Sequence, residues 1–158
     1  MAKKEYDVHM KAGKDYIGAA CGVVIENERG EILMMKRTAN TRNDHGMWSI
    51  PGGKIEFGEK AEEAIRREVV EELNLELGEL EYLGYVDHII EKDGHHWVSQ
   101  IFVAHSNTYS GGYANKEPDK CEAIEWFAWD ALPSPVSGIV DAVVELRKKI
   151  NVPRRTFF

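Results

Sequence analysis

Short segments of alternating or continuous hydrophobic residues recur along the chain and predict β-strands. They are rich in small, β-branched and aromatic side chains and are bounded by polar or glycine-containing turns. The predicted strands cover residues 18–27, 31–37, 47–53, 80–90, 95–105 and 121–129. The turns NERG and EKDG join two pairs of these strands into hairpins, and Pro and Gly interrupt the short segment at 47–53.

Two other segments carry hydrophobic residues at helical spacing. From about Glu59 to Leu73 the chain has no Pro or Gly, and apolar residues recur three and four positions apart. Asn74 is expected to end this helix, because Asn tolerates the left-handed backbone conformation better than most residues. Residues 138–150 predict a closing amphipathic helix. Strands and helices that interleave without strict β–α–β alternation predict a mixed β-sheet with helices packed on it.

The length of 158 residues suits one domain. No internal repeat and no low-complexity linker divides the sequence. We therefore predict a single domain over residues 17–150, an N-terminal tail or edge segment over residues 1–16, and a C-terminal tail over residues 151–158.

The composition is that of an ordinary globular protein, with 43% hydrophobic and 30% charged residues. No apolar run approaches the ~18 residues of a membrane span, and the first residues lack the apolar region of a secretory signal. The net charge of −7 argues against general nucleic-acid binding, which needs a basic face. Cys21 and Cys121 are too few and too distant for a disulfide scaffold, so both are expected as small core residues in a reducing compartment. These features predict a cytoplasmic protein without nucleic-acid or membrane partners.

The first predicted helix places glutamates beside its apolar stripe. The stripe consists of Ala61, Ile65, Val69 and Leu73. Glu68 and Glu72 fall within the same sector and Glu71 lies on its flank, so three carboxylates gather within one turn. Like charges at this spacing repel each other, and partial burial increases the cost. A hard divalent cation such as Mg²⁺, which prefers oxygen ligands, would remove the conflict.

A glutamate-rich helix can also be a solvated face whose carboxylates pair with Lys or Arg four positions away. Arg66 and Arg67 could serve this purpose, and Arg67 is four residues from both Glu63 and Glu71. The sequence PGG before the loop that leads into the helix favours the metal hypothesis. Glycine lets a backbone carbonyl or N–H approach a metal or phosphate closely.

The glutamates belong to a longer pattern of fixed spacing. Gly53, Glu59 and the run REVVEELNL at residues 67–75 follow G-x5-E-x7-R-E-U-x-E-E-x-G-U, where U is apolar, at all positions but one. This pattern resembles the Nudix box, and the departure is Asn74, where the box has Gly. Asn adopts the same backbone conformation at modest cost.

The resemblance extends beyond the box. GGKIEFGE at residues 52–59 is similar to the MutT-like branch of nucleoside triphosphate pyrophosphohydrolases. EPDKCEAIEWFAWDALPSP at residues 117–135 resembles a segment shared by plant and animal cytosolic members of that branch. With the first hairpin, the resemblance covers roughly residues 18–135. It implies a Nudix-type α/β/α sandwich with a mixed sheet between helices. It also implies hydrolysis of a nucleoside diphosphate linked to another group.

The resemblance further implies a metal site. Glu68 and Glu72 would be the main ligands of Mg²⁺ or Mn²⁺. Glu71 would complete the cluster, either as a ligand or through metal-bound water. The carbonyl of Gly53 or Gly52 would supply a further oxygen atom.

The same resemblance suggests which residues carry catalysis. A glutamate of the box would act as general base, with Glu68 placed ahead of Glu71 and with Glu122 as a candidate outside the box. Arg67 would contribute by pairing with carboxylates and holding the loop in register. Glu59 would be a supporting residue of that loop.

Several residues are candidates for substrate binding. Arg37 and Lys54 could contact phosphates or remain solvated rim charges, and Gly52 offers backbone to the same region. Trp48 could stack on a base or belong to the core. The histidine pair at residues 95–96 is not expected to bind one metal ion, because adjacent strand residues point to opposite faces.

The preferred hypothesis is Mg²⁺-dependent hydrolysis of a nucleoside triphosphate, dGTP-like or oxidised, to monophosphate and pyrophosphate. The first alternative keeps this chemistry with ADP-ribose, another nucleotide sugar or a non-nucleotide diphosphate as substrate. A second alternative is a Nudix module that binds a nucleotide without turnover, and a third is a purely structural acidic domain. A homodimer is the default expectation for assembly.

Overall fold

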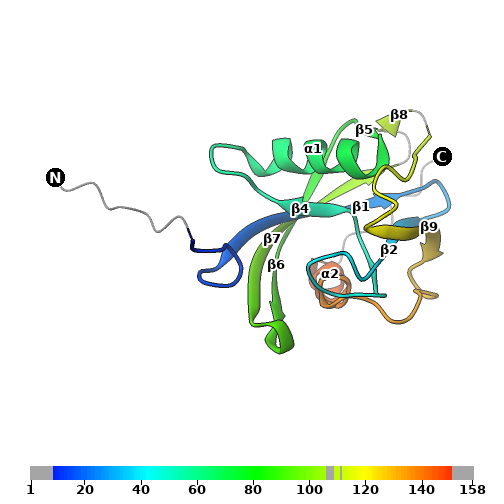
Figure 1. The fold of residues 1–158 in the computed structure, drawn as a ribbon. Helices are drawn as coiled ribbons and strands as arrows, with labels where there is room; N and C mark the ends of the chain where they lie inside the picture. Colours follow the sequence, from blue (N-terminus) through cyan, green and yellow to red (C-terminus); the bar gives the residue numbers. More distant parts are fainter. Residues whose placement is uncertain (1–8, 106–108, 111, 151–158) are drawn as a thin grey trace.

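A mixed β-sheet lies between two helices in the computed structural model, which describes residues 9–105, 109–110 and 112–150 (Figure 1). Helix α1 (Ala61–Leu73) covers one face of the sheet, and helix α2 (Gly138–Ile150) lies on the opposite side. The predicted α/β/α sandwich is therefore confirmed. No helix in the described ranges is long and apolar enough to cross a membrane.

Within the described residues, the main sheet has seven strands in the order β3-β2-β1-β7-β6, with β4 also paired to β1 and β9 to β2. Their bounds are β1 Gly18–Glu26, β2 Glu31–Arg37, β3 Trp48–Ser49, β4 Gly52–Lys54, β6 Glu81–Ile90, β7 His95–His105 and β9 Cys121–Ala128. Strands β1 and β7 run parallel, with Gly18 opposite Trp97, and the other pairs are antiparallel. Outside this sheet lie the paired strands β5 (Glu76–Leu77) and β8 (Tyr109–Ser110) and the 3-10 turn η1 (Glu91–Asp93).

Two hydrophobic cores form because strand side chains alternate between the two faces of the sheet. On β1, Val23 and Ile25 belong to the core under α1, whereas Val24 belongs to the core on the side of α2. The buried residues of α1 are Ala64, Ile65, Val69 and Leu73. Val140 and Val143 of α2 are buried in the second core. Three residues of the predicted stripe are thus buried, whereas Ala61 is only partly buried and Ala64 is buried in addition.

Both ends of α1 have a local cause. The helix begins at Ala61, two residues later than predicted, and Glu59 lies in the preceding loop. The carboxylate of Glu63 accepts the backbone N–H of Lys60 at 2.9 Å, which satisfies one of the amides at the helix start. At the other end, Asn74 has φ 54° and ψ 35°, the left-handed conformation. The prediction that Asn takes the place of the glycine of the box is confirmed.

The segment predicted as one short strand, residues 47–53, forms two strands with different partners. Strand β3 pairs with β2, and the chain then crosses to β1, where β4 places Gly52 opposite Gly22 and Gly53 opposite Cys21. Helix α1 packs against β4. This crossover brings the glycine pair onto a central strand, directly beside the acidic helix.

The N-terminal segment predicted as a tail or edge segment, residues 1–16, is described from residue 9 onward. It turns at Gly13, whose carbonyl accepts the backbone N–H of His96 at 2.8 Å, at the start of β7. The described part of the segment is therefore attached to the sheet rather than a free tail. Residues 1–8 and the predicted C-terminal tail, residues 151–158, lie outside the described residues.

Candidate active site

Two carboxylates of α1 lie on the backbone of the glycine pair. Glu72 Oε2 accepts the N–H of Gly52 at 3.3 Å. The carboxylate of Glu68 lies so close to Gly53 that a Cβ at that position would be 2.3 Å from Glu68 Cδ. Gly53 therefore leaves the space that the Glu68 carboxylate occupies. Glu68 and Glu72 thus both lie at Gly52–Gly53. Their role as metal ligands, which the resemblance to the Nudix box implies, stays a prediction.

Burial makes these two carboxylates electrostatically costly. Glu72 is half-buried as a residue, but its carboxylate lies in the interior. This burial raises the pKa of Glu72 well above its ordinary value, and the charge of Glu68 raises it further. Burial also raises the pKa of Glu68, although the hydrogen bond from Arg67 acts in the opposite direction. A cation bound between the two would relieve both effects.

Arg67 connects the helix to the loop that precedes it. Its Nε donates to Glu59 at 2.7 Å, and its Nη2 donates to the carbonyl of Lys54 at 3.0 Å. Its Nη1 donates to Glu68 at 2.9 Å and to Glu71 at 3.3 Å. These hydrogen bonds lower the pKa of Glu59 and raise that of the arginine. The expected pairing of Arg67 with carboxylates is present, and it ties the loop to α1.

Arg67→Met is expected to lower the melting temperature of the metal-free protein by about 3–10 °C, because the substitution leaves a half-buried carboxylate, Glu68, without its charged partner. Differential scanning calorimetry in a chelating buffer measures the change. The control is Arg29→Met, because the Arg29 side chain is 76% exposed and its ion pair with Glu31 should contribute little. Equal melting temperatures for Arg67→Met and the parent would show that these contacts do not stabilise the fold.

The carboxylates are chemically suited to bind a metal ion, but their side chains are not arranged as a ligand cluster in this structure. Among the described residues, no group of three or more His, Cys, Asp or Glu side chains stands close enough to hold an ion. Glu68 and Glu71 instead share the Nη1 of Arg67 as a hydrogen-bond donor. The donor set of buried carboxylate oxygens beside a glycine backbone still fits a hard divalent cation. Glu68 and Glu72 would hold it, with the Gly53 carbonyl, which now accepts the Cys21 thiol at 3.6 Å.

Both cysteines are buried and free, as expected of core residues. Burial raises the pKa of Cys21 to about 12, so its thiol is neutral beside Gly53. Across the β6–β7 hairpin, His96 Nε2 lies 3.1 Å from Asp87. Neither cysteine nor this histidine joins the carboxylates in a metal-binding group within the described chain.

The candidate phosphate-binding side chains differ in their surroundings. Arg37 donates from Nε to the Asn43 carbonyl at 3.0 Å, and burial lowers its pKa. It therefore anchors the loop before β3 and stays a prediction as a phosphate contact. Lys54 lines the cavity with Glu68. Its side chain is 43% exposed, and its amine lies 3.9 Å from the Glu56 carboxylate. Lys54 is the better placed of the two.

Outside the box, the charge of Glu117 affects the carboxylates of the site, whereas Glu122 as a general base stays a prediction. Glu122 forms an ion pair with Lys36 at 2.9 Å and is half exposed. Glu117, by contrast, raises the pKa of both Glu68 and Glu72 through its charge. Its loop is docked by the N–H of Lys116, which donates to the Glu72 backbone carbonyl at 3.0 Å. No spacing in the sequence signalled Glu117, because it approaches the helix only through this loop.

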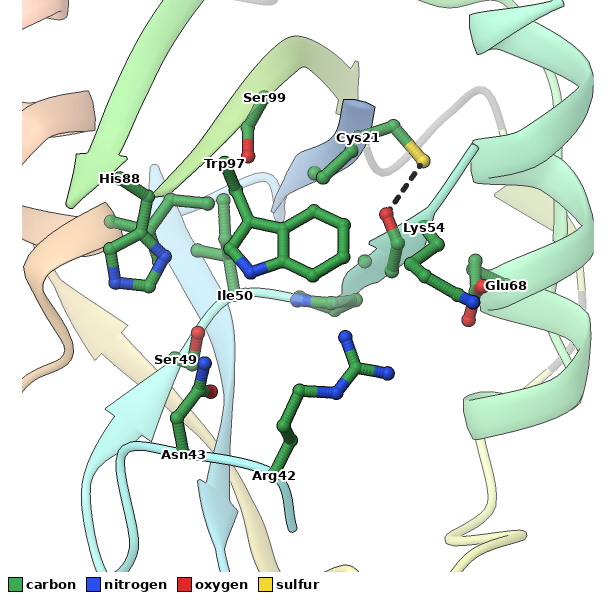
Figure 2. Close-up of a pocket in the computed structure, with 16 residues that line it drawn as sticks. Cys21, Arg42, Asn43, Ser49, Ile50, Lys54, Glu68, His88, Trp97 and Ser99 are labelled. Carbon is green, nitrogen blue, oxygen red and sulfur yellow. Dashed lines mark hydrogen bonds between the residues drawn. The ribbon is translucent and has the colours of Figure 1, made fainter. Parts of the chain in front are cut away.

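A cavity of about 260 Å³ adjoins the glycine pair (Figure 2). Its lining includes Gly53, Lys54 and Glu68 at one end and Arg42, His88 and Trp97 elsewhere. Trp48 is not among its lining residues: its ring is 9% exposed and packs edge-on against Phe127 at 4.9 Å. The structure thus places Trp48 in the core, the alternative weighed for it, and presents Trp97, which the sequence analysis did not single out.

A mixed sheet with a loop and helix that bring buried glutamates onto a glycine pair defines a Nudix-type domain. The NUDIX domain family model matches residues 17–145, and the chain belongs to this family. The crystal structure of the MutT NUDIX hydrolase from Burkholderia pseudomallei is similar, with 38% identity and a TM-score of 0.75 over 82% of this chain and 96% of that one.

Two curated relatives match over shorter shares of their own length. The 8-oxo-dGDP phosphatase NUDT18 of Danio rerio is 29% identical over 133 residues, which are 80% of this chain and 38% of that protein. The NAD-capped RNA hydrolase NudC of Pseudomonas aeruginosa is 32% identical over 108 residues, which are 66% of this chain and 34% of that protein. The chain therefore spans less than two fifths of the length of either relative.

Proposed function

We propose that this protein hydrolyses the diphosphate linkage of a nucleotide at the glycine pair, with Mg²⁺ or Mn²⁺ held by Glu68 and Glu72. The observation that carries the proposal is the meeting of these two carboxylates on Gly52–Gly53 in a Nudix domain. Nudix hydrolases generally use a divalent metal. When bound, such an ion neutralises phosphate oxygens and lowers the pKa of a bound water.

The residues of the chain supply the base and the substrate contacts. Glu68 is our preferred general base, because it is the box carboxylate that lies against Gly53 and lines the cavity. Glu71 is the alternative within the box, and Glu117 joins Glu122 as a candidate outside it. Lys54 would meet a phosphate at the cavity entrance. Arg67 and Glu59 would hold the loop in place.

The preferred substrate is a nucleoside triphosphate, dGTP-like or oxidised, cleaved to monophosphate and pyrophosphate. The similarity to an 8-oxo-dGDP phosphatase and to a MutT hydrolase supports a nucleotide. ADP-ribose or a nucleotide sugar is the alternative, because the glutamates contact the diphosphate and not its attached group. A non-catalytic module is disfavoured because all three box carboxylates are kept. A homodimer and a cytoplasmic location stay predictions from the sequence.

Purified protein with Mg²⁺ is expected to release pyrophosphate and nucleoside monophosphate from at least one triphosphate in a panel of common and oxidised nucleotides. The panel also holds ADP-ribose and nucleotide sugars, and anion-exchange chromatography identifies the products. Chelation should abolish turnover and added Mg²⁺ or Mn²⁺ should restore it. Cleavage of the sugars alone would favour the alternative, and no cleavage of any compound with either metal would contradict the proposal.

A further inference from the structure

Trp97 is a buried residue that lies outside the two hydrophobic clusters. The residue is 5% exposed, and neither cluster includes it. It lies instead in the wall of the cavity, where Figure 2 shows its indole between His88 on one side and the Lys54–Glu68 end on the other. Because only 5% of Trp97 is exposed, its indole would present a flat face to a ligand once the side chain that covers it moves aside.

The backbone of two glycines holds the indole from behind. A Cβ at Gly13 would lie 2.3 Å from the ring, and a Cβ at Gly18 would lie 2.4 Å from it. Gly18 stands opposite Trp97 in the parallel β1–β7 pair, and Gly13 is fixed by the N–H of His96. Gly13 also has φ +79°, a conformation that favours glycine. The indole therefore cannot shift toward these glycines when a ligand packs against its other face.

The turn at Gly13 lies before residue 17, where the match to the NUDIX domain begins. The wall behind Trp97 is thus partly built by a segment outside the matched domain. This segment, residues 9–16, is attached through Gly13 to the start of β7. Its position gives it a direct influence on the shape of the cavity.

From the cavity, the guanidinium of Arg42 lies over the indole, 5.2 Å from the ring centroid. Arg42 is an exposed residue of the loop before β3, so its side chain can shift at little cost. A guanidinium stacks on flat aromatic groups in general. A planar ligand on Trp97 would therefore find a second stacking partner above it.

Polar atoms around the indole can form hydrogen bonds with the edge of such a planar ligand. His88 Nε2 is buried and makes no hydrogen bond within the described chain, although Asp44 lies 3.4 Å away. Asn43 and the buried Ser99 line the same cavity. The volume of about 260 Å³ lies just below the ~300–1,000 Å³ usual for whole ligands, which suits one ring system.

We infer that Trp97 is the stacking surface for the nucleobase of the substrate, backed by the turn at Gly13 and covered by Arg42. The inference rests on the proposed function, since one cavity joins Trp97 to Glu68 and Gly53. With the diphosphate at the glutamates, the group attached to it reaches the indole. A planar purine base fits this end better than a second sugar. The segment before the Nudix domain thereby takes part in substrate choice.

The test measures binding without turnover. Calorimetric titration in metal-free buffer compares deoxyguanosine monophosphate with ribose 5-phosphate, which lacks the base. The parent should bind the nucleotide more tightly. Trp97→Leu should weaken nucleotide binding about 5- to 150-fold, the usual contribution of one base stacked on an aromatic ring, and leave ribose 5-phosphate unchanged. Trp97→Phe, which keeps a ring, should recover much of the loss.

Gly13→Ala tests the backing turn while leaving the indole itself intact. Its methyl group would displace the ring and should weaken nucleotide binding at least about fivefold. Gly30→Ala is the matched control: Gly30 has a similar φ of +74°, but no atom lies within 4 Å of its added Cβ. This control carries the same backbone strain without touching the site, and it should bind as the parent does.

The results separate this inference from the proposed function. Equal nucleotide affinity in the parent, Trp97→Leu and Gly13→Ala would overturn the stacking role, and so would a parent that binds both ligands equally. Hydrolysis of a diphosphate by the parent would still stand in that case. Loss of nucleotide binding in Trp97→Leu, in a protein that cleaves nothing, would support the inference while the hydrolase proposal fails.

Discussion

Glu72→Gln is expected to lower turnover by about 10²-fold or more and, in metal-free buffer near neutral pH, to raise the melting temperature. Both effects come from the same charge. The carboxylate lies in the interior beside Glu68, where burial raises its pKa and makes its ionised form costly. Glutamine keeps the acceptor for the Gly52 N–H and removes the charge. The substitution thus removes a destabilising buried charge from the metal-free fold. It also removes a charged ligand of the proposed metal ion.

The pH dependence follows from the direction of the pKa shift. The folded state holds the proton of Glu72 more tightly than the unfolded state does, because the pKa is raised above 4.5 on folding. The stability of the parent therefore falls as pH rises from about 4.5 to the folded pKa and then levels off. The gain from Glu72→Gln should be absent below that range and complete above it. Thermal melts across the pH range measure this.

Added Mg²⁺ should reverse the order of stability. The parent gains stability by binding the ion in its folded state, and the variant gains less. Glu79→Gln, the same chemical change at an exposed position, should alter neither turnover nor melting temperature. Unchanged turnover in Glu72→Gln would remove this residue from the metal site. A lower melting temperature at neutral pH would show that its charge makes a favourable contact.

Gly53→Ala and Gly52→Ala should fail in different ways. The methyl group at residue 53 would overlap Glu68 Cδ at 2.3 Å, but that carboxylate ends a flexible side chain and can move. The protein should fold and lose about 10²-fold in turnover, the size of loss expected when a reacting group is misplaced by ~1 Å. At residue 52 the methyl group would meet the backbone carbonyl of Cys21 at 2.2 Å. Since β1 cannot move aside, Gly52→Ala should lose stability, by about 1–3 kcal/mol or more.

Chemical denaturation and steady-state hydrolysis distinguish the two outcomes. The control is Gly112→Ala, because Gly112 is exposed and a Cβ there meets no atom within 4 Å. It should match the parent in both measurements. Full turnover in Gly53→Ala would mean that the place of Glu68 on the glycine backbone does not matter for the reaction.

Much of the fold was predictable because its signals are local. The alternation of Val23, Val24 and Ile25 assigns each side chain to one face of β1, whatever the neighbouring strand is. The end of α1 follows the local backbone preference of Asn74. The crossover of the chain from β2, where β3 pairs, to β1, where β4 pairs, was not predicted, because residues 47–53 carry no signal for which strand they will join.

In the site, too, the features that depend on local spacing were predictable, and those that depend on tertiary contacts were not. Glu68, Glu71 and Glu72 could be grouped because helical spacing places them on one turn. The contacts of Arg67 with Lys54 and the loop were expected only in outline. Trp48 was weighed as a stacking residue, yet its neighbour in the fold is Phe127 and it packs in the core.

The sequence alone determined that one sector of the helix carries both apolar residues and glutamates, and that a glycine pair precedes this helix. Both features depend on separations of a few residues. The tertiary structure decided that Gly52–Gly53 lies under that helix, that Glu117 approaches it, and that Gly13 backs Trp97. These juxtapositions join residues far apart in the chain. They depend on which strands and loops become neighbours when the two cores close.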